Sequence, residues 1–174
     1  RFIQESIIHK TSEVNTELPI KLKHALTKIF ETKFGQKIKN HMQATNKKLT
    51  FAITTGEDAD FSALEETIYY TLDIEHWYQA HLEFIPPAAN LDIATLDILI
   101  AHEIGHTQIG REVMGLASLN SFLYSEASDG GMVLVFSRKI VQEEELRTTH
   151  FFENAYRSEI QVPIRYSYYE AYDV

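Results

Sequence analysis

Cysteine is absent from the 174 residues of this chain. Its absence excludes disulfide bonds and thiolate metal sites, so the protein ligands of any metal must be histidines or carboxylates. Proline and glycine are sparse, at four and seven residues, and no linker, repeat or low-complexity segment divides the sequence. No apolar run approaches the ~20 residues that a transmembrane helix needs. We therefore expect one domain, residues 1–174, with enough apolar residues (44%) for a core.

The net charge of −9 is unevenly distributed along the chain. Residues 1–48 contain ten Lys or Arg and four Glu, whereas residues 49–174 contain six basic and twenty-one acidic residues. We interpret 1–48 as a basic helical front segment and 49–174 as the catalytic part. Such lysines are typical of a solvated helix face, although they could bind an anionic partner. Because the acidic remainder repels phosphate, we expect no nucleic-acid partner. We also expect no membrane partner, and a monomer.

Residues 102–106 read His-Glu-Ile-Gly-His. On a helix, positions i and i+4 lie on the same face, so His102 and His106 can offer two imidazoles to one metal ion. Glu103 lies beside them, where it can act as the general base for a water molecule at the metal. This spacing predicts a zinc metallopeptidase.

The sequence around the motif predicts a buried helix. An apolar stretch follows the helix-starting residues Asn90 and Asp92, and Gly110 is a natural end. Unpaired polar groups are costly inside a protein, so two histidines and a glutamate on such a helix indicate a site rather than a plain core.

The remaining pattern predicts an α+β domain with helices at both ends. We expect helices at about residues 19–35, 36–44 and 138–160, and strands at 49–54, 67–72, 81–85 and 132–136. In the zincin-like fold that we predict, a small, mostly antiparallel sheet packs on the motif helix. Strand 81–85 is our candidate edge for docking a peptide.

A catalytic zinc ion keeps three protein ligands, so a third ligand is needed. In gluzincin-type enzymes it is a Glu on a later helix, often followed three residues on by a small residue that lets the helices pack closely. Glu145 fits best, because Thr148 follows it at that spacing. Glu144, Glu153 and His150 are the alternatives.

Three further segments follow the motif in order: Glu-Glu-Leu-Arg-Thr at 144–148, Glu-Asn-Ala-Tyr-Arg-Ser-Glu at 153–159, and Pro-Ile-Arg-Tyr-Ser-Tyr at 163–168. Together with the motif they resemble the NleD-type effector metalloprotease family over roughly residues 80–168. The resemblance implies that Glu145 is the third ligand. It also implies that four residues support the site, namely Glu153, Asn154, Arg157 and Arg165.

The resemblance bears on two further positions. A donor must stabilise the oxyanion of the reaction, and Tyr168 is the candidate because it matches the terminal Tyr of the family. Tyr166 and Tyr169 are close enough to be alternatives. The family usually has Gly just before the turn that leads to its Pro, whereas this chain has Gln161.

The function that the resemblance implies is that of a secreted or injected bacterial effector or toxin domain. It would act with Zn²⁺ in the cytoplasm of a target cell and cleave a protein or peptide, host signalling kinases being one substrate class. Two other hypotheses remain open. One is a zinc hydrolase acting on a non-protein amide, and the other is a non-catalytic zinc-binding interaction module.

Overall fold

The computed structural model describes most of the chain, in the ranges 1–11, 14–15, 17–54, 60–72, 95–117, 124–126, 132–134 and 138–165. Three predictions lie outside the described residues: the strand at 81–85, the start of the motif helix at Asn90 or Asp92, and the tyrosines at 166, 168 and 169. No helix among the described residues is long and apolar enough to cross a bilayer.

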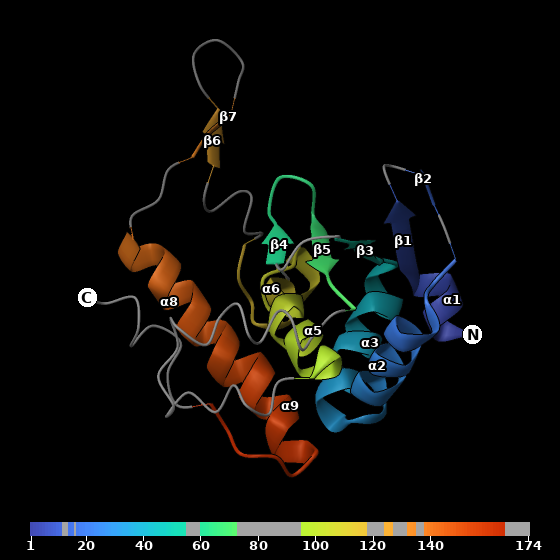
Figure 1. Cartoon of the computed structure of the whole chain (residues 1–174). Coiled ribbons are helices and arrows are strands. Elements are labelled where there is room, and N and C mark those ends of the chain that lie inside the picture. The colour runs from blue at the N-terminus through green and yellow to red at the C-terminus, as the bar shows by residue number, and fades with distance from the viewer. Residues whose placement is uncertain are drawn as a thin grey trace.

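Helices alternate with short strands along the chain (Figure 1). The helical elements are α1 (Phe2–Ser6), α2 (Ile20–Glu31), α3 (Lys33–Thr45), α5 (Leu96–Ile104), α6 (Gln108–Val113), α8 (Arg138–Thr148), the π-helical segment η3 (Thr149–Glu153) and α9 (Asn154–Glu159). The strands are β1 (Ile7–Thr11), β2 (Val14–Asn15), β3 (Leu49–Ile53), β4 (Asp60–Ser62), β5 (Thr67–Tyr70), β6 (Tyr124–Glu126) and β7 (Met132–Leu134). The predicted α+β class is confirmed.

Five strands form a mixed sheet in the order β2-β1-β3-β5-β4. The central pairs β1–β3 and β3–β5 are parallel, and only the outer pairs are antiparallel. The prediction of a mostly antiparallel sheet, with its first strand at residue 49, is therefore wrong. Strand β1 lies in the front segment that we expected to be helical. Helices α2 and α3 then carry the chain over to β3, and such a helical crossover produces parallel pairing.

The helices pack below the sheet, and α5 lies between α2–α3 on one side and α8 on the other (Figure 1). Leu22, Leu26 and Ile29 form an apolar stripe along α2, and all three are fully buried. Burial of each of these side chains contributes about 1.5–3 kcal/mol to the free energy of folding. The break between the two helices comes at Thr32 and not at Gly35, because the Thr32 side chain accepts a hydrogen bond from the Gly35 N–H and caps α3.

The predicted C-terminal helix is confirmed as the run α8–η3–α9, which ends at Glu159. Its middle turn is π-helical, a local widening that often marks a functional site. Just beyond the helix, Gln161 has a φ of 62°, in the left-handed region that favours glycine.

Candidate metal centre

The motif straddles the end of α5. Helix α5 ends at Ile104, and His106 lies in the turn that follows. This turn is tightened by i→i+3 bonds, in which Gly105 N–H donates to the His102 carbonyl at 3.0 Å and His106 N–H donates to the Glu103 carbonyl at 3.1 Å. The prediction that both histidines belong to one helix reaching Gly110 is therefore wrong. The tight turn nevertheless keeps the two rings together, with centroids 5.3 Å apart.

A new helix, α6, explains why α5 stops early. Thr107 caps α6, because its hydroxyl accepts a hydrogen bond from the Gly110 N–H at 3.0 Å. Gly110 is buried where α6 meets the end of α5, and a Cβ there would lie 2.1 Å from the Ile104 carbonyl oxygen. Glycine at this position thus permits a close approach of the two backbones and does not end the motif helix.

The structure brings His102, His106 and Glu145 together in the interior. Glu145 Oε2 lies 2.8 Å from His102 Nε2, and its Oε1 lies 3.2 Å from His106 Nε2. One ligand atom from each residue lies within 4.8 Å of the others, so this buried cluster could hold a metal ion. His106 Nε2 is buried without a hydrogen bond of good geometry to any described residue. Buried polar atoms are rarely left so, and a cation at this position would give the nitrogen a partner.

Close packing of α8 and η3 against the motif places Glu145 over the two rings. A Cβ on Gly105 would lie 2.6 Å from Thr148 Cγ2 and 2.9 Å from the Phe152 ring, so only glycine fits between them. Thr148 is fully buried and lies three residues after Glu145. The small residue that pointed to Glu145 in the sequence therefore lies at the helix contact.

Behind His102 lies the first of two carboxylate–arginine supports. His102 Nδ1 lies 3.0 Å from Glu153 Oε1, and Arg157 Nε donates to Glu153 Oε2 at 2.8 Å. Arg165 Nη1 donates to Glu153 Oε1 at 3.1 Å, and the backbone of Arg165 is held by the Asn154 side chain. A carboxylate on the outer nitrogen of a histidine fixes the tautomer that directs the other nitrogen at a metal.

A second support of the same kind lies behind His106. His106 Nδ1 lies 3.3 Å from Glu144 Oε1, while Arg111 Nη1 and Arg147 Nη2 each donate to Glu144 at 2.5 Å. Arg147 Nη2 also donates to the Gly105 carbonyl at 2.8 Å, in the turn that carries the histidine. Arg147 thus holds both the backbone of this turn and the carboxylate behind the His106 ring.

Electrostatics in the cluster follow from these contacts. Burial alone lowers the pKa of His102 and of His106, but the surrounding carboxylates outweigh it and raise the two pKa values to about 9 and about 10. Burial raises the pKa of Glu144 and of Glu153, yet their histidine and arginine partners bring both down to about 2. The two histidines hold the pKa of Glu145 well below its usual range despite its burial. Glu144, Glu145 and Glu153 are therefore all ionised at neutral pH.

Glu103 has a different environment. Burial, together with the charges of Glu145 and Asp60, raises the pKa of Glu103 to about 7, although the two histidines lower it. Beside Asp60, the Phe61 ring of strand β4 stacks on His106 with an interplanar angle of 10°. The edge strand of the sheet thus lies next to the cluster.

The other candidate residues take separate places. Glu144 and Glu153, the alternatives for the third ligand, lie behind the rings on their Nδ1 sides. His150 is exposed. Tyr168 lies outside the described residues, so its role stays a prediction. Sequence reasoning missed Arg111, which follows directly on Gly110, the predicted end of the motif helix, and is buried in the structure, where a charge needs a partner.

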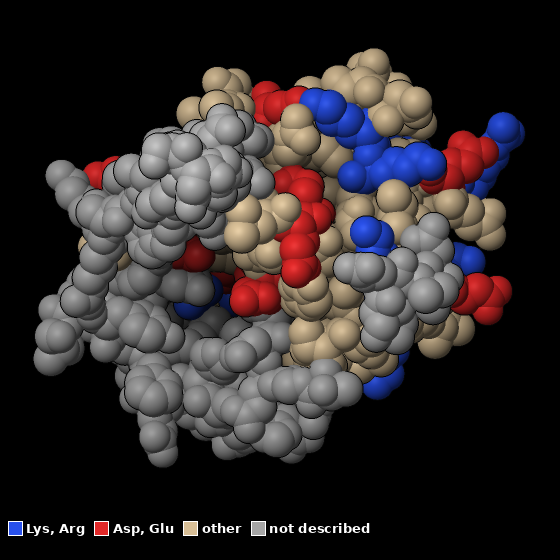
Figure 2. Space-filling model, turned by 90° about the horizontal axis from the view of Figure 1, so that it is seen from above, with Lys and Arg blue, Asp and Glu red and all other residues tan. Residues whose placement is uncertain are grey.

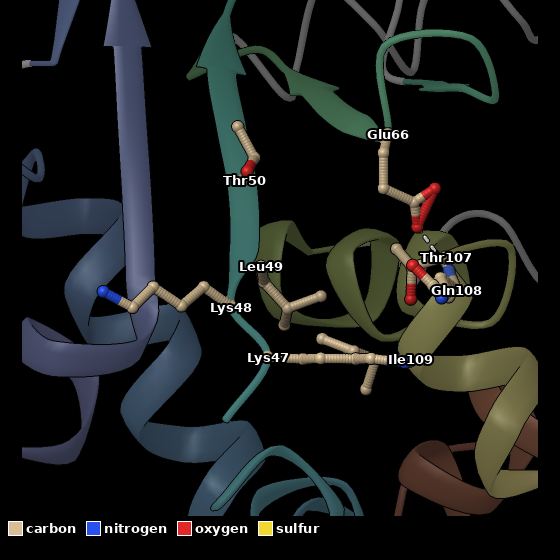
Figure 3. Close-up of a pocket in the computed structure, with 8 residues that line it drawn as sticks. All are labelled: Lys47, Lys48, Leu49, Thr50, Glu66, Thr107, Gln108 and Ile109. Carbon is tan, nitrogen blue, oxygen red and sulfur yellow. Dashed lines mark hydrogen bonds between the residues drawn. The ribbon is translucent and has the colours of Figure 1, made fainter. Parts of the chain in front are cut away.

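Seen from above, acidic side chains gather beside a hollow in the middle of the molecule, while most visible Lys and Arg lie toward α1–α3 (Figure 2). A separate small pocket of about 100 Å³ lies between the start of α6 and strand β3 (Figure 3). In it the Glu66 carboxylate accepts a hydrogen bond from the Gln108 N–H, which ties the β4–β5 hairpin to α6. Burial raises the pKa of Glu66.

No known protein family, curated protein or solved structure matches this chain. The resemblance to the NleD-type family therefore stays a prediction from the sequence, and the functional argument rests on the site itself.

Proposed function

We propose that this chain is a zinc-dependent endopeptidase with a zincin-like fold. The observation that carries the proposal is the convergence of His102, His106 and Glu145, with Glu103 adjacent to them. Two imidazoles and one carboxylate without sulfur are a common ligand set for catalytic zinc, which leaves a fourth position open. A zinc ion held there supplies Lewis-acid chemistry, polarising the scissile carbonyl and making a water molecule more acidic.

Glu103 is the general base of this proposal. Its pKa of about 7 places it near the ideal for exchanging protons at neutral pH. It accepts the proton of the attacking water molecule and returns it to the leaving amine. Its neighbour His102 carries the Nδ1 hydrogen bond to Glu153, so the base and this ligand are held at the same end of α5.

The two arginine-held carboxylates have a positioning role. Glu153 and Glu144 accept the Nδ1–H of the histidines, which leaves both Nε2 atoms facing the Glu145 carboxylate. When a metal displaces the Nε2 protons, each ring is thereby held in the tautomer that keeps its proton on Nδ1. Oxyanion stabilisation by Tyr168 is part of the proposal and comes from the resemblance alone.

The biological setting of the proposal also comes from the resemblance. We infer a bacterial effector or toxin domain that reaches the cytoplasm of a target cell and cleaves a protein there, with signalling kinases as one substrate class. The acidic surface beside the hollow suits a cationic peptide segment better than an anionic one (Figure 2).

The test compares wild type with Glu103→Gln, which keeps the shape of the side chain and removes the base. Zinc content per chain is measured in both, and each is incubated with lysate of a candidate target cell while new peptide N-termini are identified by mass spectrometry. We expect one zinc ion per chain in both proteins and new termini with wild type only. Equal termini in both, or wild-type protein that takes up no zinc, would refute the endopeptidase. Zinc in both, with turnover of a small amide only, would favour the hydrolase hypothesis.

A further inference from the structure

The outer surfaces of α2 and α3 carry a set of lysines that the proposed activity does not use. We call this set the lysine face. It consists of Lys21, Lys23, Lys28, Lys33 and Lys37, all exposed. Their ammonium groups form no ion pair within the described part of the chain. The acidic side chains on or against these helices include the exposed Glu31, the Glu159 carboxylate that accepts the Lys33 and Phe34 N–H groups, and Glu112, which contacts His41 of α3.

We propose that the lysine face docks on an anionic lipid bilayer surface. Unpaired lysines on a folded, otherwise acidic protein form a local positive patch, and such a patch is attracted to anionic headgroups. The sequence alone gave no reason to expect a membrane partner, because it did not show that these lysines of α2 and α3 are exposed and form no ion pair with another described residue.

The composition of the lysine face distinguishes a lipid surface from a protein partner. Residues 20–48 contain eight Lys and no Arg. Protein interfaces are enriched in Arg and aromatic residues and depleted in Lys, and Arg is preferred where a planar, two-pronged contact is required. The one large apolar side chain exposed on this helix pair is Ile20, 68% accessible, and it lies beside Lys21. Lysines with a single exposed aliphatic side chain suit the headgroup layer of a bilayer, where the charges are diffuse and no planar, two-pronged contact is required.

The position of the lysine face fits this role. Helix α2 and the segment η3 both pack against α5. Helix α5 lies between the α2–α3 pair and α8 (Figure 1). The metal cluster is built from α5, its following turn and α8. A protein that lies on a membrane through α2 and α3 therefore keeps these site-building elements directed away from the lipid. The inference does not depend on the proposed peptidase activity.

The matched variants are Lys28→Glu on the lysine face and Lys48→Glu beside strand β3, which change the net charge equally. The Lys48 side chain is exposed, and it points away from the small pocket (Figure 3). Binding is measured by co-sedimentation with phosphatidylcholine vesicles, with and without about one third phosphatidylserine, at low and at physiological salt. Each lysine near such a surface is worth about 1 kcal/mol, or about fivefold in affinity.

We expect wild type to bind the anionic vesicles at least tenfold more tightly than the neutral ones, and less tightly as salt rises. Lys28→Glu should weaken this binding at least fivefold, Lys28→Glu/Lys37→Glu at least about 25-fold, and Lys48→Glu less than twofold. Circular dichroism confirms that each variant is folded. Equal binding to both vesicle types, equal effects of the two single variants, or tighter binding to duplex DNA or polyglutamate than to vesicles would overturn the proposal.

Discussion

Replacing Arg147 by Met tests whether the carboxylate–arginine support behind His106 determines the affinity of the site for zinc. Methionine keeps most of the length and removes the hydrogen bonds to the Gly105 carbonyl at 2.8 Å and to Glu144 at 2.5 and 3.2 Å. Glu144 keeps its contact with Arg111, so no carboxylate is left wholly unpaired. Hydrogen bonds to charged groups are worth about 1.5–3 kcal/mol, so we expect a loss of about 2–3 kcal/mol. For a chain of this size this lowers Tm by about 4–12 °C.

The affinity for zinc should fall more specifically. Outer partners of metal-binding histidines are worth about 10- to 100-fold in affinity, and Arg147→Met should lie in this range. Arg147→Lys should be intermediate, because an ammonium cannot bridge two acceptors in one plane. Met42→Ala is the control for a loss of stability away from the site, because the Met42 side chain on α3 lies in the hydrophobic core and is 1% exposed. It should cost about 2–5 kcal/mol and leave zinc affinity within twofold.

Affinity is measured by competition with a chromophoric chelator, and the visible spectrum of the Co²⁺-loaded protein reports the ligand geometry. If Arg147→Met binds zinc as tightly as Met42→Ala does, the arginine acts on stability alone and the positioning argument fails.

Four more predictions follow from the geometry. At pH 8 the metal-free protein holds protons on His102 and His106, whose pKa values are about 9 and about 10, so zinc binding should release about two protons. Calorimetry in two buffers of different ionisation enthalpy counts the released protons. Release of less than one proton per zinc ion would contradict the prediction. Because these pKa values are raised on folding, the stability that they give the metal-free protein is fully present below pH 6.5 and lost as pH rises through 9–10, which urea melts can follow. Gly105→Ala places a Cβ 2.6 Å from Thr148 Cγ2 and should cost about 1–3 kcal/mol in thermal melts. Gln161→Gly relieves a φ of 62° and should stabilise by about 0.5–1 kcal/mol; lower stability would refute that strain.

The ligand cluster was predictable because local rules determine it. Although α5 ends before His106, the four-residue spacing still brings His102 and His106 together, because a tight i→i+3 turn rotates the chain nearly as far as a helical turn does. Glu145 could be selected because Thr148, the small residue beside it, is needed where two helices touch. Neither inference required knowledge of the sheet.

The strand order and the second support could not be predicted in this way. Strand β1 is a five-residue run in a lysine-rich segment, and its partner β3 lies beyond two helices. Such pairing depends on tertiary packing rather than on local preference. Arg111 joins Glu144 across 33 positions, and no periodic pattern connects residues at that separation.

Charge balance explains why four arginines surround so small a cluster. Above the Glu103 pKa of about 7 and with neutral imidazoles, four carboxylates (−4) and four arginines (+4) cancel; they are Glu103, Glu144, Glu145 and Glu153 with Arg111, Arg147, Arg157 and Arg165. Two protons on the histidines bring the total to +2, and so does one divalent cation on neutral histidines. The metal can therefore replace the protons without changing the net charge that the surrounding fold must stabilise. Without the arginines the loaded cluster would carry −2, which would oppose the negative charge that develops on a carbonyl oxygen under attack. In the proposed peptidase, the arginines would thus both stabilise the metal-free site and suit the loaded site to an anionic transition state.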